Sequence, residues 1–179
     1  MFLLVIVALL SCTHKLQPQN SVYSSVIDIL NDASQKKKSK KHVVNTHVYE
    51  RRMKAVKLFN IEVDTSRLNR FIVVDVGNFE GTDYLGEIEC NDSLKYYYTS
   101  SYFFSDSGIV VKKFNYPPLT FKTERLIFDY LKSHRFAELE ALANEKGKTL
   151  SGSSFYSIGM YEKGMDSIYV KLIPAFMIN

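Results

Sequence analysis

The sequence predicts an α+β protein with an antiparallel β-sheet of five or six strands, packed against one long or kinked helix. Three observations predict this class. Short apolar or alternating segments follow one another from residue 70 to 114, separated by polar turns. A segment with helical apolar spacing follows, and two further alternating segments end the chain. The length of 179 residues, of which 46% are hydrophobic, suits one domain with a substantial core.

Two helices are expected before the sheet, as an N-terminal helical arm. The segments 21–33 and 46–59 both carry apolar residues three or four positions apart, which is the spacing of one helix face. Asn20 or Ser21 can cap the first of these helices.

The strands are expected from their apolar patterns and from the turns between them. The first is apolar almost throughout, which indicates a buried strand, and Asn91-Asp-Ser93 is a turn signal. Lys163-Gly-Met165 indicates a final hairpin. The expected strands are 70–77, 84–90, 94–104, 109–114, 153–162 and 167–173.

The long helix is expected at 121–147, with Thr120 as its cap and Gly147 at its end. Its apolar residues recur at steps of three or four, but this stripe slips around Ser133-His-Arg135. We therefore expect a kink or two helices.

The N-terminus carries a separate signal. Residues 2–10 are apolar, and the run ends at Leu9-Leu-Ser-Cys12. This tetrad resembles the lipobox of bacterial lipoproteins with a type II signal peptide. The resemblance implies cleavage before Cys12 and acylation of that cysteine, with palmitate among the expected acyl groups. The run is far shorter than the roughly 20 residues of a transmembrane helix, but it matches the apolar core of a cleavable signal.

The predicted organisation has three parts: a signal peptide at 1–11, a lipidated tether with a short helix and a Lys-rich linker at 12–45, and a single α+β domain at 46–179. Five lysines lie within Lys36–Lys41. This run is interpreted either as a docking site for anionic lipid or as a solvated linker. We expect no nucleic-acid partner, because no aromatic residue alternates with these lysines as a stacking platform.

Few residues suggest metal or thiol chemistry. Cys90 is the only cysteine besides Cys12, and we expect a buried, unreactive thiol because the neighbouring Glu89 disfavours a thiolate. His42 and His47 are five residues apart, which does not align two ligands on one helix face. We expect no metal, no cofactor and no catalytic residue.

Three carboxylates share one face of the second strand: Asp83, Glu87 and Glu89. Such a set can raise the pKa of its members, hold a calcium ion or act as an acid/base pair. The opposite face, with Tyr84 and Ile88, is the apolar one. We therefore expect the three carboxylates to face water.

Aromatic residues lie on both faces of the strand 94–104. One face of the sheet is needed for the long helix, so the rings on the other face need a different cover. Either the N-terminal helix covers them or they form an exposed recognition patch. The candidate contact set is Tyr96, Tyr98 and Tyr102.

These features favour a membrane-anchored lipoprotein of the cell envelope, facing the periplasm, that acts non-enzymatically by binding a protein partner in assembly, inhibition or immunity. An envelope module that binds a small ligand or a glycan is the alternative. An envelope hydrolase is less favoured, because it would require Glu87 and Glu89, or His134 with a serine, to converge in a cleft.

Overall fold

The structure is a computed structural model that describes seven stretches of the chain: residues 25–36, 46–78, 83–103, 108–117, 121–147, 154–165 and 168–178. The predicted signal peptide, Cys12 and most of the lysine run lie outside these ranges. None of the described helices combines the length and the apolar character that a membrane-spanning helix requires.

The described chain forms four helices and six strands. Their bounds are α1 (Val26–Lys36), α2 (Thr46–Phe59), β1 (Arg70–Asn78), β2 (Asp83–Cys90), β3 (Leu94–Phe103), β4 (Gly108–Phe114), α3 (Phe121–Lys132), α4 (Phe136–Lys146), β5 (Ser154–Glu162) and β6 (Tyr169–Pro174).

All six strands belong to one antiparallel sheet with the order β4-β3-β2-β1-β5-β6. The first four strands form a meander, because each pairs with the next along the chain. After α3 and α4 the chain returns to the free side of β1, where β5 pairs with it, and β6 completes the sheet. The predicted α+β class and the antiparallel sheet are therefore confirmed.

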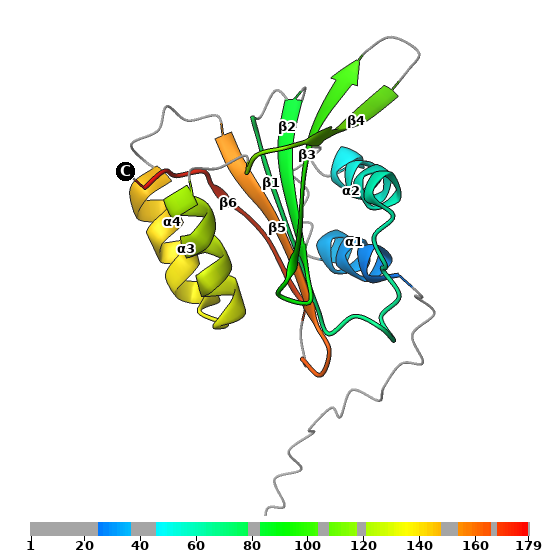
Figure 1. Cartoon of the computed structure of the whole chain (residues 1–179). Helices are drawn as coiled ribbons and strands as arrows, with labels where there is room; N and C mark the ends of the chain where they lie inside the picture. The colour runs from blue at the N-terminus through cyan, green and yellow to red at the C-terminus, as the bar shows by residue number, and fades with distance from the viewer. Residues whose placement is uncertain are drawn as a thin grey trace, which may run out of the picture.

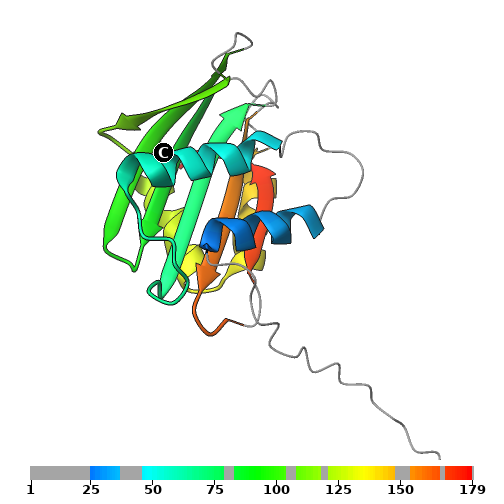
Figure 2. The same cartoon turned by 90° about the vertical axis from the view of Figure 1, so that its right-hand side faces the viewer.

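The sheet is covered on both faces. Helices α1 and α2 lie on one side and α3 and α4 on the other (Figure 1). Turned by 90°, α1 and α2 cross in front of the strands (Figure 2). The sequence predicts the long helix on one face and leaves the N-terminal helix as one of two alternatives for the other face, and the structure places α1 and α2 there.

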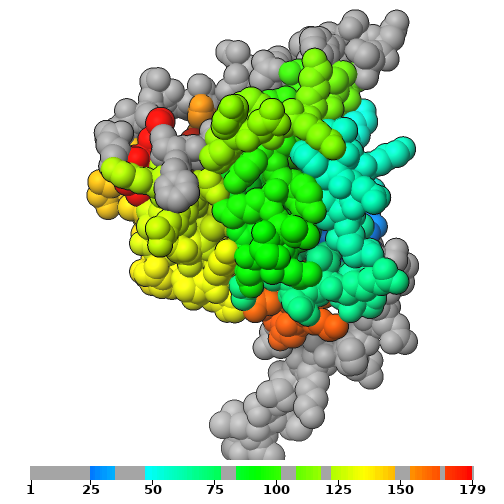
Figure 3. Space-filling model, in the orientation of Figure 1, coloured from blue at the N-terminus to red at the C-terminus, as the bar shows by residue number. Residues whose placement is uncertain are grey.

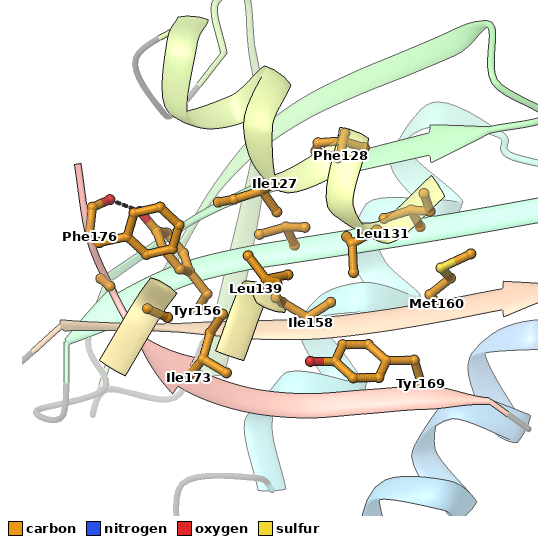
Figure 4. Close-up of a cluster of buried hydrophobic side chains, with 14 residues drawn as sticks. Ile127, Phe128, Leu131, Leu139, Tyr156, Ile158, Met160, Tyr169, Ile173 and Phe176 are labelled. Carbon is orange, nitrogen blue, oxygen red and sulfur yellow. Dashed lines mark hydrogen bonds between the residues drawn. The ribbon is translucent and has the colours of Figure 1, made fainter. Parts of the chain in front are cut away.

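The core between the sheet and α3 and α4 is built from alternate residues of the central strands. Ile72 and Val74 of β1 and Ile158 of β5 point toward the helices, which contribute Ile127 and Leu139. All five side chains are at most 2% exposed. Figure 4 shows this cluster, including the Tyr156 hydroxyl that donates a 2.5 Å hydrogen bond to the carbonyl of Phe176.

The opposite core includes α1. Val26, Ile27 and Leu30 are each at most 1% exposed and pack in the cluster with Phe71 and Val73 of β1. The Tyr49 hydroxyl of α2 donates a 2.7 Å hydrogen bond to Asp28 of α1. The sequence placed this helix in the tether, before a domain that starts at residue 46. In the structure, α1 packs in the same core as the strands of that domain.

The expected irregularity in the long helix is a complete break between α3 and α4. His134 has a φ of 57°, in the left-handed region that ends helices. The amide of His134 donates to the carbonyl of Leu131, and that of Arg135 donates to the carbonyl of Tyr130. These two bonds satisfy two of the last carbonyls of α3.

Gly86 of β2 is required by a neighbouring ring. A Cβ atom at this position would lie 2.0 Å from Cζ of Tyr98, whose side chain is fully buried. We expect Gly86→Ala to lower the free energy of unfolding by about 3 kcal/mol, because the ring is too tightly packed to move aside. Urea denaturation measures this loss. Gly108→Ala is a poor control because its φ is positive, so the reference is Ala137→Gly, at an exposed helical position.

Candidate functional site

The structure separates the three tyrosines of the predicted contact set. Tyr98 is fully buried, so its predicted place in an exposed set is wrong. Its ring lies across Gly86 beneath α2, and its hydroxyl donates a short hydrogen bond to Asp75. Tyr96 is partly buried, with its ring centroid 5.1 Å from that of Phe59 in α2. The side chain of Tyr102 lies outside the described residues. The N-terminal helical cover is thus the correct alternative for Tyr96 and Tyr98.

Beneath α2, Tyr98 belongs to a buried polar network. Arg52 donates from Nε to Asp75 at 2.8 Å, and from Nη2 to the carbonyl of Ser157 at 2.9 Å. Asp75 is fully buried, and the side chain of Arg52 is 5% exposed. Burial, followed by the charge of Asp75, raises the pKa of Tyr98, which keeps the phenol neutral as a donor. This network fixes α2 to β1, β3 and β5.

The carboxylates of β2 do not face water, so that prediction is wrong for Glu87 and Glu89. Glu87 is fully buried and Glu89 is 1% exposed, while the side chain of Asp83 lies outside the described residues. Glu124 of α3 lies beside them. Two lysines compensate the charge: Nζ of Lys132 lies 2.5 Å from Glu89, and Nζ of Lys95 lies 2.5 Å from Glu124.

One member of this carboxylate cluster, Glu87, keeps its proton to an unusually high pH. Burial raises the pKa of Glu87 to about 9, and a hydrogen bond with Glu124 adds to the shift. Burial opposes the charge of Lys95, but its hydrogen bond to Glu124 and the charges of Glu87 and Glu89 raise the pKa of that lysine overall. Glu87 is therefore neutral and Lys95 charged near pH 7. Within the described ranges, no group of three His, Cys, Asp or Glu side chains is placed to hold a metal ion.

The other predicted groups lie apart. Burial raises the pKa of the buried Cys90 thiol to about 12, and the charge of Glu89 adds to the effect. His134 contacts a carboxylate, with its Nε2 lying 2.9 Å from Glu162. Glu87 and Glu89 are buried, and the side chains of Lys95 and Lys132 contact them.

No helix of the described residues covers one part of the sheet. On the side of α3, the outer strands β3 and β4 present Tyr97, Lys112 and Phe114, and Tyr116 follows β4. Tyr97 and Phe114 are direct cross-strand partners, and the rings of Phe114 and Tyr116 meet edge to face at 6.3 Å. Phe114 is 37% exposed and Tyr116 71% exposed. In the space-filling view, the surface of β3 lies between α3 and α2, with β4 above it (Figure 3).

We call this surface the open face and define it by Tyr97, Lys112, Phe114 and Tyr116. Sequence reasoning missed it because it belongs to the opposite parity of β3 from the predicted tyrosine set. A signal was present, since Tyr97, Thr99 and Ser101 alternate with the buried positions. Two sets of side chains alternate along β3, and the helices α2 and α3 determine by their reach across the sheet which set remains exposed. The periodicity of the strand does not contain that information.

The described residues thus form an α+β protein whose antiparallel sheet lies between two helical pairs. Its β3–β4 end is left partly open by these helices. No family model, no curated protein and no solved structure matches the chain.

Proposed function

We propose that this protein is a lipid-anchored lipoprotein of the bacterial cell envelope, facing the periplasm, that acts non-enzymatically by binding a protein partner. The tetrad Leu9-Leu-Ser-Cys12 supports the anchor. Two or three acyl chains on Cys12 would attach the protein stably, because each buried CH₂ group contributes about 0.8 kcal/mol.

The open face is the observation that supports partner binding. Protein interfaces are enriched in aromatic residues, which offer a large contact area at low conformational cost. Phe114 and Tyr116 are two of the five large hydrophobic residues that are exposed in the described chain, and they contact each other. Lys112 adds a positive charge beside the rings, which favours a partner surface that is apolar at its centre and acidic at its edge.

The anchor is tested at Cys12. We expect Cys12→Ala to abolish labelling by a clickable fatty acid and to leave the signal peptide uncleaved, because the thiol is the acyl acceptor. In-gel fluorescence and the mobility of the precursor measure both effects. Cys90→Ala is the matched control and should label like the unchanged protein. Continued labelling and membrane fractionation of the Cys12 variant would contradict the anchor.

The open face is tested by photo-crosslinking in intact cells. A photoreactive residue at Tyr116 should give a discrete adduct with one envelope protein. Phe114→Ser, in the same photoreactive protein, should reduce that adduct at least tenfold, because a buried aromatic contact is worth about 2 kcal/mol at an interface centre.

The control variant for the open face is Met177→Ser, a comparably exposed apolar position at 55% exposure that lies outside this surface. It should leave the adduct unchanged. Absence of an adduct, or equal loss with both serine variants, would contradict the open face as the partner site. Retention on purified cell-wall glycan in that case would favour the glycan-binding alternative.

A further inference from the structure

A cavity lies between α1 and α2, over the strands β5 and β6. Its aliphatic walls include Ile27 of α1, Val48 of α2 and Val170 of β6, while Arg52 of α2 and Ser157 of β5 contribute polar groups. Among the described residues that line it, Arg52 is the only charged one. The free space is about 310 Å³, and part of this volume is open solvent, so the enclosed part admits only a small molecule.

Arg52 has one guanidinium nitrogen to spare in this cavity. Its Nε donates to Asp75, and its Nη2 donates to the carbonyl and to the hydroxyl of Ser157. These hydrogen bonds within the described chain leave Nη1 without an acceptor. A Cβ atom at Gly159 would lie 3.1 Å from Nη1 and 3.0 Å from Cδ1 of Leu30. Nη1 therefore lies beside Leu30, which also lines the cavity.

Ser157 supplies a second donor to the same cavity. Its hydroxyl oxygen accepts from Nη2 of Arg52 at 3.2 Å. Accepting this bond leaves the hydrogen of the hydroxyl available for an acceptor. Arg52 and Ser157 are only 4% and 7% exposed. Donors that lie this deep favour a bound acceptor, because an unused buried donor costs free energy.

The charges next to the cavity are not balanced. Asp75 is fully buried and already accepts from Arg52 and from Tyr98. Arg51, the neighbour of Arg52 on α2, is 1% exposed, and its Nε and Nη2 have no hydrogen-bond partner. The charges of both arginines and of Asp75 act on Tyr98. Among the described residues of this network, two guanidinium groups therefore meet one carboxylate.

We propose that the cavity between α1 and α2 binds a small organic carboxylate, of the size of acetate or propionate. Its oxygens would accept from Nη1 of Arg52 and from the hydroxyl of Ser157, as charge-assisted hydrogen bonds. Its negative charge would balance the second guanidinium group. The aliphatic walls suit a short alkyl group, as in most small-molecule sites. This site is separate from the open face and does not depend on it.

The test is a titration of the full-length lipidated protein in detergent with sodium acetate, and separately with sodium propionate, at constant ionic strength set by sodium chloride. We expect saturable NMR shifts of the backbone amides in α1 and around Arg52 and Ser157, with a dissociation constant in the low millimolar range. Propionamide, a neutral molecule of similar shape, should bind at least tenfold more weakly, because its hydrogen bonds with the arginine lack the ligand's charge.

Two variants with matched controls locate the site. Ser157→Ala removes one donor and should weaken propionate binding about tenfold. Ser100→Ala changes another buried serine, on β3 and outside the cavity, and should bind like the unchanged protein. Val48→Phe fills the cavity and should abolish the saturable shifts, whereas Val111→Phe on β4 should leave them. Circular dichroism checks that each variant is folded.

Three results would overturn the proposal. If neither carboxylate gives saturable shifts, the cavity holds only water. If propionamide binds as tightly as propionate, the cavity takes a neutral molecule and the charge has no part in recognition. If propionate binding persists undiminished in Val48→Phe or, where that variant does not fold, in Ser157→Ala, the carboxylate binds elsewhere.

Discussion

Replacing Arg52 with leucine is expected to lower the free energy of unfolding by about 3–5 kcal/mol, the usual cost of removing one partner from a buried ion pair. Asp75 would keep only the hydrogen bond from Tyr98, and its charge would remain fully buried. The carbonyl of Ser157 would also lose its donor. Urea denaturation at pH 7 measures the effect as a shift of the midpoint at constant slope.

Arg51→Leu is the matched control for this prediction. The two arginines are neighbours on α2 and are both at most 4% exposed, but among the described carboxylates only Asp75 is contacted, and by Arg52. We expect Arg51→Leu to cost much less, since it removes a ring contact and also an uncompensated charge. Equal losses in the two variants would show that side-chain volume under α2, rather than the Asp75 pair, determines stability.

Glu87→Gln is expected to change how stability depends on pH. The pKa of Glu87 is about 9 in the folded protein, compared with an ordinary value of 4.5. Between these two values the folded state keeps a proton that the unfolded state has lost. Stability therefore falls as the pH rises through this window, with a slope of at most about 1.4 kcal/mol per pH unit from this group.

The glutamine variant has no such proton, and its amide can still donate to Glu124. We expect the stability of Glu87→Gln, relative to the unchanged protein, to rise from pH 5 to pH 8. Urea midpoints at unit pH steps measure the difference. Glu138→Gln, with a side chain that is 59% exposed, is the control and should give a flat difference. Parallel profiles for Glu87→Gln and the unchanged protein would show that Glu87 is ionised in the folded state.

The strand and helix pattern could be predicted because it depends on local periodicity. The apolar run at the start of the sheet forms β1, whose side chains contribute to both cores. The interruption of the apolar helix pattern near His134 corresponds to the break between α3 and α4. The break follows from local chemistry, because the helix needs a residue in the left-handed conformation at that point.

The fate of the carboxylates could not be predicted in the same way. Alternation along β2 correctly placed Ile88 in a core but gave no information about the other face. Burial of the pair is possible because Glu87 keeps its proton, while Lys95 on β3 and Lys132 on α3 lie beside Glu89. These lysine–glutamate contacts depend on which helix packs on that face of the sheet. The alternation of residues along a strand does not predict the packing of a distant helix.

If Cys12 carries the proposed lipid, the burial of α1 limits how far the protein can extend from the membrane. With α1 in the core, residues 13–24 separate Cys12 from the first described residue, Ser25. Fully extended, this stretch spans about 45 Å, whereas a tether running to residue 46 would span about 120 Å. A body anchored through Cys12 would therefore stay within a thin layer next to the lipid headgroups. A partner of the open face would have to bind the protein within that layer.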